Sequence, residues 1–199
     1  VVSVSRFCKE VLEKQGIVVD FVIDNPAYYD IDRTSAGKKN GKLLYVGSFD
    51  YYGKGIDRLV RLAKSGISID CMTDKAPPFP LGHIPKTGCR ETLKEYYKEY
   101  DGLVFPSRFE GAGLVAIEAM CLGKPVFMSD TGIAQELSKY VPDYVVDFDS
   151  EGVTDHIKKV CISNSENDSA VDEYLEKYHS KKIYVQKWGE LISSMEGCK

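Results

Sequence analysis

Residues 105–120 of this chain read Phe105-Pro106-Ser107-Arg108-Phe109-Glu110-Gly111-Ala112-Gly113-Leu114-Val115-Ala116-Ile117-Glu118-Ala119-Met120. The apolar residues up to Phe105 predict a buried strand, the Pro/Ser/Gly residues a loop, and the apolar spacing that follows a helix. Because a helical turn takes about 3.6 residues, Glu118 lies near the face on which the helix begins. Glycines allow close approach to the backbone, and a helix N-terminus attracts anions. The pattern favours a ligand with hydroxyls and phosphates.

The same arrangement also occurs in α/β proteins in which both glutamates are merely solvated, so the wider context matters. Residues 106–120, followed by Gly123-Lys124-Pro125-Val126 and by residues 129–137, resemble the donor-binding half of the family 4 (group 1) retaining glycosyltransferases. The match includes the family's motif of two glutamates separated by seven residues, here Glu110 and Glu118. These are two-domain enzymes of the GT-B fold. The resemblance implies a Rossmann-like, doubly wound and mainly parallel sheet, the C-terminal domain of such an enzyme.

The composition agrees with one α/β domain and limits the kinds of partner. A chain of 199 residues with 43% hydrophobic residues can bury a core. A net charge of −4 without a basic stripe argues against nucleic-acid binding. The six cysteines are scattered, which predicts reduced thiols, with Cys71 and Cys121 as small core residues. No apolar run is long enough for a membrane span. Asp101 and Asp130 are too dispersed for a metal site, so we expect no metal.

Strands and helices alternate along most of the chain, which predicts a mainly parallel sheet covered on both faces. The predicted strands are residues 18–23, 43–46, 67–72, 103–105, 125–128 and 144–146. The predicted helices are residues 55–64, 91–100, 113–122, 133–137, 151–163 and 183–194, with a polar linker at 164–169. Ligands of such sheets bind at the carboxyl ends of the strands. The loops after Val46, Met72 and Phe105 should therefore converge on one crevice.

The expected domain organisation has three parts. Residues 1–16 resemble the last strand and helix of the family's acceptor domain, residues 17–163 form the donor-binding domain, and residues 164–199 form a linker and a C-terminal helix. The chain begins at Val1 rather than at Met, which indicates an excised fragment. We expect such a fragment to bind donor but to need its N-terminal domain for transfer.

A second glycine-containing loop, from Gly47 to Gly55, follows the strand that ends at Val46. Lys54 stands immediately before a predicted helix, where it could neutralise a diphosphate, although most Lys-Gly pairs are ordinary solvated loops. In the family that this loop resembles, the lysine contacts the donor phosphates. Ser48 stands where many members carry an arginine that also serves the diphosphate, which leaves Lys54 as the principal candidate cation.

The resemblance is less complete around residues 71–84. In the family, the segment corresponding to Gly82-His83-Ile84 lies against the nucleotide base through backbone groups. His83 could act as a catalytic base, but a single loop histidine is more often a surface residue. The Thr73-Asp74 loop lacks the family's usual Gly-x-Gly, so no role is carried over to it.

The resemblance implies retaining transfer of a sugar from a UDP- or GDP-sugar to an acceptor hydroxyl, without a cofactor. Glu110 and Lys54 are the expected catalytic residues: Glu110 orients sugar hydroxyls, while Lys54 and the helix start at Gly113 stabilise the leaving group. Glu118 is expected to bind the ribose hydroxyls. The expected substrate-binding residues are Gly47, Ser48, Lys54, His83, Ile84, Glu110, Gly111, Ala112, Gly113, Leu114 and Glu118.

The sequence supports one alternative function in part and argues against another. A non-catalytic nucleotide-sugar-binding or scaffold module of the same fold is supported by Ser48 and by the Thr73-Asp74 loop. A dehydrogenase-like domain requires a Gly-x-Gly-x-x-Gly after the first strand, and the sequence has none. The expected partners are a nucleotide sugar and, through the missing domain, an acceptor saccharide or lipid-linked sugar. We expect a cytoplasmic protein, with peripheral membrane contact through residues 181–187 left open.

Overall fold

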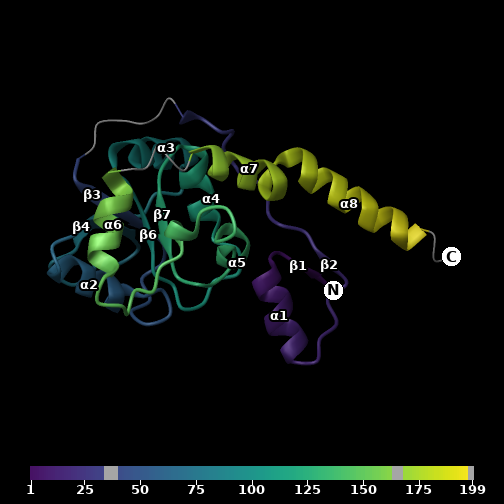
Figure 1. Ribbon diagram of the computed structural model, residues 1–199, viewed down its shortest axis with the longest axis horizontal. Helices are drawn as coiled ribbons and strands as arrows, with labels where there is room; N and C mark the ends of the chain where they lie inside the picture. Colours follow the sequence, from purple (N-terminus) through teal and green to yellow (C-terminus); the bar gives the residue numbers. More distant parts are fainter. Residues whose placement is uncertain (34–39, 163–167, 197–199) are drawn as a thin grey trace.

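A five-stranded parallel sheet forms the centre of the computed structural model, which describes residues 1–33, 40–162 and 168–196. The strand order is β5-β4-β3-β6-β7, so the chain runs outward from β3 in one direction and outward from β6 in the other (Figure 1). This is a doubly wound sheet whose topological switch point lies between β3 and β6. The strands are β3 (Lys42–Val46), β4 (Ser68–Thr73), β5 (Gly82–Pro85), β6 (Gly102–Phe105) and β7 (Val126–Met128).

The central strands are apolar on both faces, as is typical of a parallel sheet covered by helices. All four residues of β6 are buried, and so are Leu43 to Val46 of β3. The two strands pair with Leu43 opposite Gly102. A Cβ atom on Gly102 would lie 2.8 Å from the carbonyl oxygen of Pro125, so only glycine allows β6 to start so close to the segment before β7.

Helices connect the strands and cover both faces of the sheet. Right-handed crossovers place α2 on one face and α3 and α4 on the other. A hydrogen bond between Tyr97 of α3 and Glu118 of α4 joins the last two helices. The helices of the described residues are α1 (Arg6–Lys14), α2 (Ile56–Lys64), α3 (Arg90–Glu99), α4 (Leu114–Cys121), α5 (Ala134–Leu137), α6 (Val153–Ile162), α7 (Asp168–His179) and α8 (Lys181–Glu196), with a 3₁₀ helix, η2 (Pro142–Tyr144).

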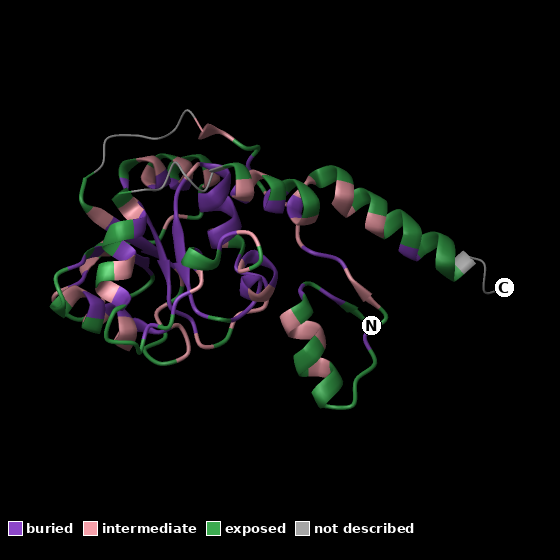
Figure 2. Ribbon diagram, in the orientation of Figure 1, coloured by how far each residue is buried: buried purple, intermediate pink, exposed green. Residues whose placement is uncertain are grey.

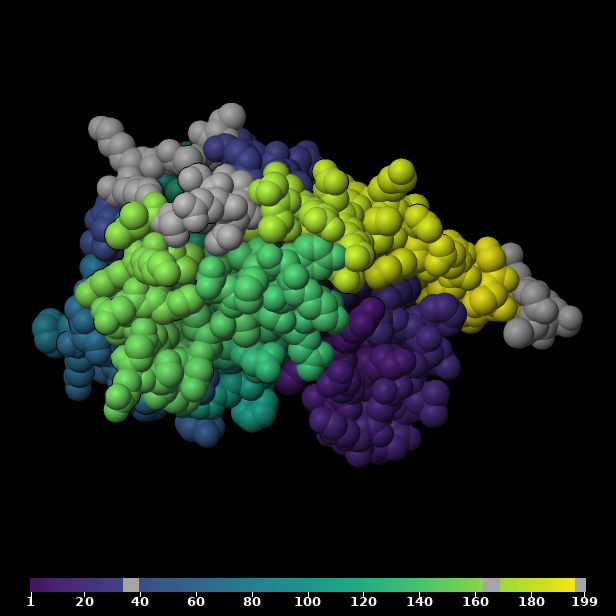
Figure 3. Space-filling model, viewed as in Figure 1, coloured from purple at the N-terminus to yellow at the C-terminus, as the bar shows by residue number. Residues whose placement is uncertain are grey.

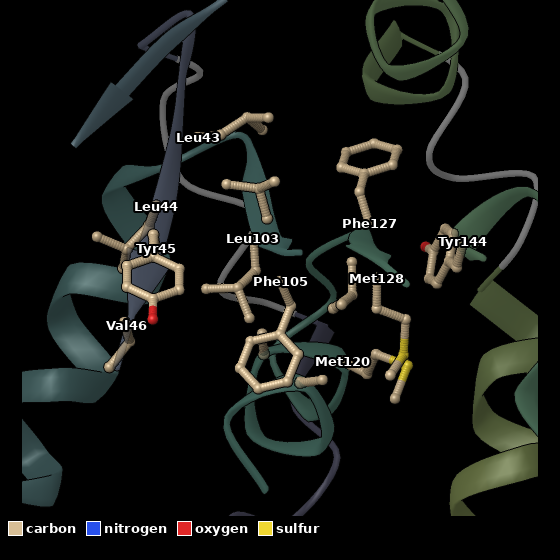
Figure 4. Packing of buried hydrophobic residues seen from close by; sticks show 14 of the residues in the cluster. Leu43, Leu44, Tyr45, Val46, Leu103, Phe105, Met120, Phe127, Met128 and Tyr144 are labelled. Atoms are coloured by element: carbon tan, nitrogen blue, oxygen red, sulfur yellow. The ribbon is translucent and has the colours of Figure 1, made fainter. Parts of the chain in front are cut away.

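The hydrophobic core includes both faces of the sheet, with α2 packed on one side and α4 on the other. Residues Ala116 to Cys121 of α4 are all buried, which is the pattern of a helix enclosed on every side. Figure 4 shows side chains from β3, β6, α4 and β7 meeting there, with the rings of Phe127 and Tyr144 at a centroid distance of 6.4 Å. The buried residues are concentrated in the strands and in α4, whereas α1 and the outer half of α8 are largely exposed (Figure 2). The core therefore holds β6 and α4, and the loop between them, in fixed positions.

The N-terminal residues form a separate small unit. Strands β1 (Val2–Ser3) and β2 (Phe21–Val22) pair in parallel, with α1 between them in the chain, and do not join the main sheet. The unit lies beside the main body and below α8 (Figure 3). Ion pairs fasten it there, from Arg6 to Glu136 of α5 at 3.2 Å and from Asp24 to Lys187 of α8 at 2.7 Å.

Three sequence predictions need correction, and one helix was missed. The strand predicted at 18–23 is only Phe21–Val22. The one predicted at 144–146 is a single bridge from Val145 to Met128, because Tyr144 belongs to the 3₁₀ turn η2 that begins at Pro142. The loop predicted at 82–84 is strand β5, a half-exposed edge strand without an apolar pattern. Helix α7 was not predicted. The predicted linker 164–169 falls mostly on residues outside the described ones.

The other predicted elements are confirmed to within about two residues, which is the usual uncertainty of element ends. The described cysteines are free, and Cys71 and Cys121 are buried as expected, whereas Cys198 lies outside the described residues. None of the helices in the described ranges is both long and apolar enough to cross a membrane. The domain boundaries expected after residues 16 and 163 remain predictions.

Candidate functional site

Two loops meet at the switch point of the sheet, one after β3 (residues 47–55) and one after β6 (residues 106–113). The backbone N–H of Arg108 donates to the carbonyl of Gly53 at 2.9 Å, and its guanidinium donates to the carbonyl of Tyr52 at 2.7 Å. Gly55 has φ +73°, and a Cβ atom there would lie 2.3 Å from the carbonyl oxygen of Pro106. Both facts require glycine at position 55, because any side chain would push the two loops apart.

The loops bring Lys54 and Glu110 into direct contact. The Lys54 ammonium lies 2.8 Å from a carboxylate oxygen of Glu110, and the side chains are 30% and 17% exposed. The pair borders a cavity of about 380 Å³ at the carboxyl ends of β3 and β6. Of the residues predicted to bind substrate, the cavity is lined by Gly47, Ser48, Lys54, Glu110, Ala112, Gly113 and Leu114.

Gly111 is also in this loop but serves a different contact. Its carbonyl oxygen accepts a hydrogen bond from the Ser5 hydroxyl at 2.6 Å, and Ser5 is the N-cap residue of α1. The N-terminal unit therefore holds the backbone next to Glu110.

Both helices that begin at the crevice start without a side-chain cap. The N-cap residues are Gly55 for α2 and Gly113 for α4, each with positive φ. Gly113, Leu114 and Val115 line the cavity, so the first turn of α4 borders it directly. The first backbone N–H groups of a helix have no partner within the helix and carry its positive dipole end. This end of α4 can therefore donate hydrogen bonds to an anion.

Glu118 lies in an adjoining cavity of about 640 Å³, which shares Asn25 and Leu114 with the first cavity. The Glu118 side chain is only 2% exposed, and the guanidinium of Arg90 forms an ion pair with it. The same guanidinium lies 4.9 Å from the ring centroid of Tyr28. Arg90 thus covers the carboxylate predicted to bind ribose.

The hydroxyl of Tyr97 holds the other oxygen of Glu118, donating to it at 3.3 Å. Burial raises the pKa of Tyr97 far above its usual value, so this hydroxyl keeps its proton. Glu118 is therefore held as a charged acceptor between Tyr97 and Arg90.

The Thr73-Asp74 loop, to which the sequence assigned no role, supports the loop after β3. An Asp74 carboxylate oxygen accepts from the backbone N–H of Phe49 at 2.7 Å, and this hydrogen bond lowers the pKa of Asp74. The hydroxyl of Tyr45 donates to the carbonyl of Ser48 at 3.1 Å. These bonds position residues 47–49 at the edge of the cavity.

His83 and Ile84, like Gly111, are predicted residues that line neither cavity. Both belong to edge strand β5, where His83 is exposed and its Nε2 lies 3.2 Å from the carbonyl oxygen of Thr73. Two residues that were not predicted to bind substrate line the cavities instead: Lys86 lines the smaller one and Arg90 the larger one. The available signal was their position shortly after β5, at the same edge of the sheet.

A further cavity, of about 560 Å³, lies beyond the loop after β6 and contains Arg58 and Arg108. Both guanidinium groups are already paired, Arg58 with Asp149 at 2.5 Å and Arg108 with Asp57 at 2.7 Å. Its charges are therefore matched internally. Among the described residues, no group of three or more His, Cys, Asp or Glu side chains could hold a metal ion.

Residues 75–162, which include the loop after β6 and both glutamates, match the family model described as glycosyl transferases group 1. This segment is therefore similar in sequence to the group 1 glycosyltransferases. The chain is also 32% identical over 144 residues to an uncharacterized glycosyltransferase of Methanocaldococcus jannaschii. That alignment covers 58% of this chain and 37% of the relative.

Two solved structures share the fold of this chain, which agrees with a domain of the GT-B type. A sucrose-phosphate synthase from Thermosynechococcus elongatus matches with a TM-score of 0.77 and 18% identity, over 100% of this chain and 58% of the other. An α,α-trehalose-phosphate synthase (UDP-forming) from Burkholderia vietnamiensis matches with a TM-score of 0.67 and 13% identity, over 99% and 60%. The chain thus spans less than two thirds of each of these relatives, and the fold predicted from the sequence is confirmed.

Proposed function

We propose that this chain is the donor-binding domain of a glycosyltransferase that transfers a sugar, with retention of configuration, from a nucleoside diphosphate sugar to an acceptor hydroxyl. The observation that carries the proposal is the convergence of Lys54, Glu110 and the uncapped start of α4 on one cavity at the switch point. Cations and free N–H groups suit phosphates, and carboxylates suit sugar hydroxyls.

The order of the two cavities suggests how a donor lies. The diphosphate would occupy the smaller cavity beside Lys54 and Gly113, and the ribose would reach Glu118 in the adjoining one, past Leu114. Glu110 would accept hydrogen bonds from the transferred sugar. One protein of similar fold is named as a UDP-forming synthase, so UDP-sugars are the first donors to test.

The chemistry assigned to these residues is electrostatic. As the bond between the sugar and the diphosphate breaks, negative charge grows on the departing phosphate oxygen. Lys54 and the N–H groups at the start of α4 would stabilise that charge. Glu110 would leave Lys54 and turn to the sugar hydroxyls. We propose that no metal takes part, which is tested by adding EDTA to the binding assay.

Isothermal titration calorimetry with UDP, GDP, ADP and the corresponding sugar nucleotides tests the proposal. We expect saturable binding of at least one nucleoside diphosphate and of its sugar derivative, unaffected by EDTA. Absence of binding by every nucleotide would overturn the proposal. The acceptor saccharide or lipid-linked sugar, cytoplasmic location and membrane contact remain predictions for the full-length protein.

A non-catalytic nucleotide-sugar-binding module is the second candidate, and it is favoured by the neutral side chain of Ser48 in the cavity. It would bind the same ligands. Release of free nucleotide from a sugar nucleotide by the full-length protein in the presence of acceptor would exclude it.

A further inference from the structure

The charged side chains that line the smaller cavity have a net positive charge, and Lys54 does not account for it. The cavity lining includes the charged side chains of Lys54, Glu110 and Lys86. Lys54 and Glu110 neutralise each other at 2.8 Å. Among the described residues, Lys86 forms no ion pair within 4.0 Å, so it supplies the net positive charge of this cavity.

The sheet explains why Lys86 reaches a cavity that is centred on other strands. Lys86 is the first residue after β5, whose last residue, Pro85, pairs with Thr73 at the end of β4. Parallel strands end at the same edge of the sheet, so the loops after β3, β5 and β6 open on one side. A lysine side chain is long enough for Lys86 to line this cavity while it remains exposed to solvent.

The remaining charged neighbour does not remove this excess. Asp74 is close enough to interact electrostatically with Lys86, but its carboxylate is already engaged by the backbone N–H of Phe49. A diphosphate carries more than one negative charge near neutral pH. Lys54, which is already paired with the Glu110 carboxylate, neutralises only part of the charge of a diphosphate.

We propose that Lys86 is a second diphosphate-binding residue of this domain, acting together with Lys54. It supplies the positive charge that the loop after β3 lacks at Ser48, where the backbone borders the same cavity but the side chain is neutral. This inference rests on the proposed function and names a ligand contact that sequence motifs do not mark.

Calorimetric titration with inorganic pyrophosphate, and with whichever of UDP and GDP binds the wild type more tightly, tests the inference. Lys86→Ala should weaken the binding of both ligands about five- to tenfold, because a hydrogen bond to a charged group is lost and the exposure of Lys86 reduces its strength. Lys86→Arg should retain most of the affinity. The loss should shrink at high salt, because solvent-exposed charges are screened. Affinities of Lys86→Ala equal to those of the wild type would overturn the inference.

Lys75→Ala is the matched control. Lys75 is another exposed lysine, in the segment between β4 and β5, but it does not line the cavity, so its loss should change neither affinity. Equal losses in Lys75→Ala and Lys86→Ala would mean a general effect of net charge and would also overturn the inference. Thermal melts of all variants check that each one is folded.

A compensating variant gives a readout that a structural role would not produce. Adding Ser48→Arg to Lys86→Ala should restore pyrophosphate affinity, because it places a cation on the other side of the same cavity. Failure of the double variant to recover, despite a normal melt, would contradict the charge argument. If the wild type binds neither pyrophosphate nor nucleotide, the proposed function fails. If the wild type binds and Lys86→Ala binds equally well, only this inference fails.

Discussion

The ammonium of Lys54 and the carboxylate of Glu110, which are fifty-six positions apart in the chain, lie 2.8 Å from each other at the topological switch point. Each is the nearest charged partner that the other has in the cavity before a ligand enters. A donor with phosphates and sugar hydroxyls offers a new partner to each at once. On the proposed function, donor binding would replace this ion pair with a lysine–phosphate pair and hydrogen bonds from sugar hydroxyls to Glu110. The pair keeps both partly buried side chains compensated when no ligand is bound.

Replacing Lys54 should weaken nucleoside diphosphate binding. We expect Lys54→Ala to lose about 1.5–3 kcal/mol of binding free energy, because the phosphate loses a charged donor and Glu110 is left unpaired beside it. Calorimetry measures this against Lys64→Ala, which removes an exposed lysine from the last turn of α2, the helix that follows the loop of Lys54. Affinity unchanged by Lys54→Ala would disprove the phosphate assignment.

The two glutamates should have separable effects. Glu118→Gln should weaken a nucleoside diphosphate and its sugar derivative alike, because both contain ribose. Glu110→Gln should weaken only the sugar derivative, because the bare nucleotide gains an unpaired Lys54. Comparing the four affinities tests this division. Equal effects of both variants on the bare nucleotide would contradict it.

The pair of Arg90 with the buried Glu118 should contribute to stability. Arg90→Ala leaves a buried carboxylate with Tyr97 as its remaining partner, and Arg90 is 40% exposed, so we expect a loss of about 1–2 kcal/mol rather than the larger cost of breaking a fully buried pair. Urea denaturation measures it. Adding Glu118→Gln should recover most of the loss, and a double variant as unstable as the single one would show that packing against Tyr28 matters more.

Glycine at position 55 should be indispensable. Gly55→Ala combines a positive φ with a contact of 2.3 Å to a backbone oxygen, so we expect at least about 2 kcal/mol of destabilisation and weaker nucleotide binding. The control is Gly88→Ala, since a Cβ atom there meets nothing within 4 Å. Similar thermal melts for the two variants would refute the argument.

Glu136 should make stability depend on pH. Burial raises its pKa above the ordinary 4.5, despite the favourable charges of Arg6 and Lys139 and with Asp24 adding to the rise. The folded state therefore holds this proton more tightly than the unfolded chain, and stability falls as pH rises from about 4.5 through the folded pKa. We expect Glu136→Gln to melt above the wild type at pH 7, with the gap closing near pH 4.

The control for this titration is Glu95→Gln, which neutralises an exposed carboxylate and should leave the pH profile unchanged. A Glu136→Gln variant that melts below the wild type at pH 7 would mean that the ion pair with Arg6 outweighs the cost of burial.

The sequence was sufficient for the elements with strong local patterns. Strand β6, the glycine loop and helix α4 were predicted because an apolar run, loop residues and helical spacing follow one another directly. The positions of Glu110 and Lys54 at the carboxyl ends of adjacent strands followed from the rule for parallel sheets. Strand β5 and helix α7 escaped prediction because an edge strand of four half-exposed residues carries little periodicity, and α7 follows a polar segment.

Only the tertiary structure decided which side chains share the site. The order β5-β4-β3-β6-β7 brings Lys86 to the cavity of Lys54 and leaves His83, three residues earlier, on an exposed edge. The packing of α3 against α4 places Arg90 over Glu118. Local periodicity reports which face of an element is buried. The neighbours across that face are determined by strand order and helix packing, which depend on burial summed over the whole chain.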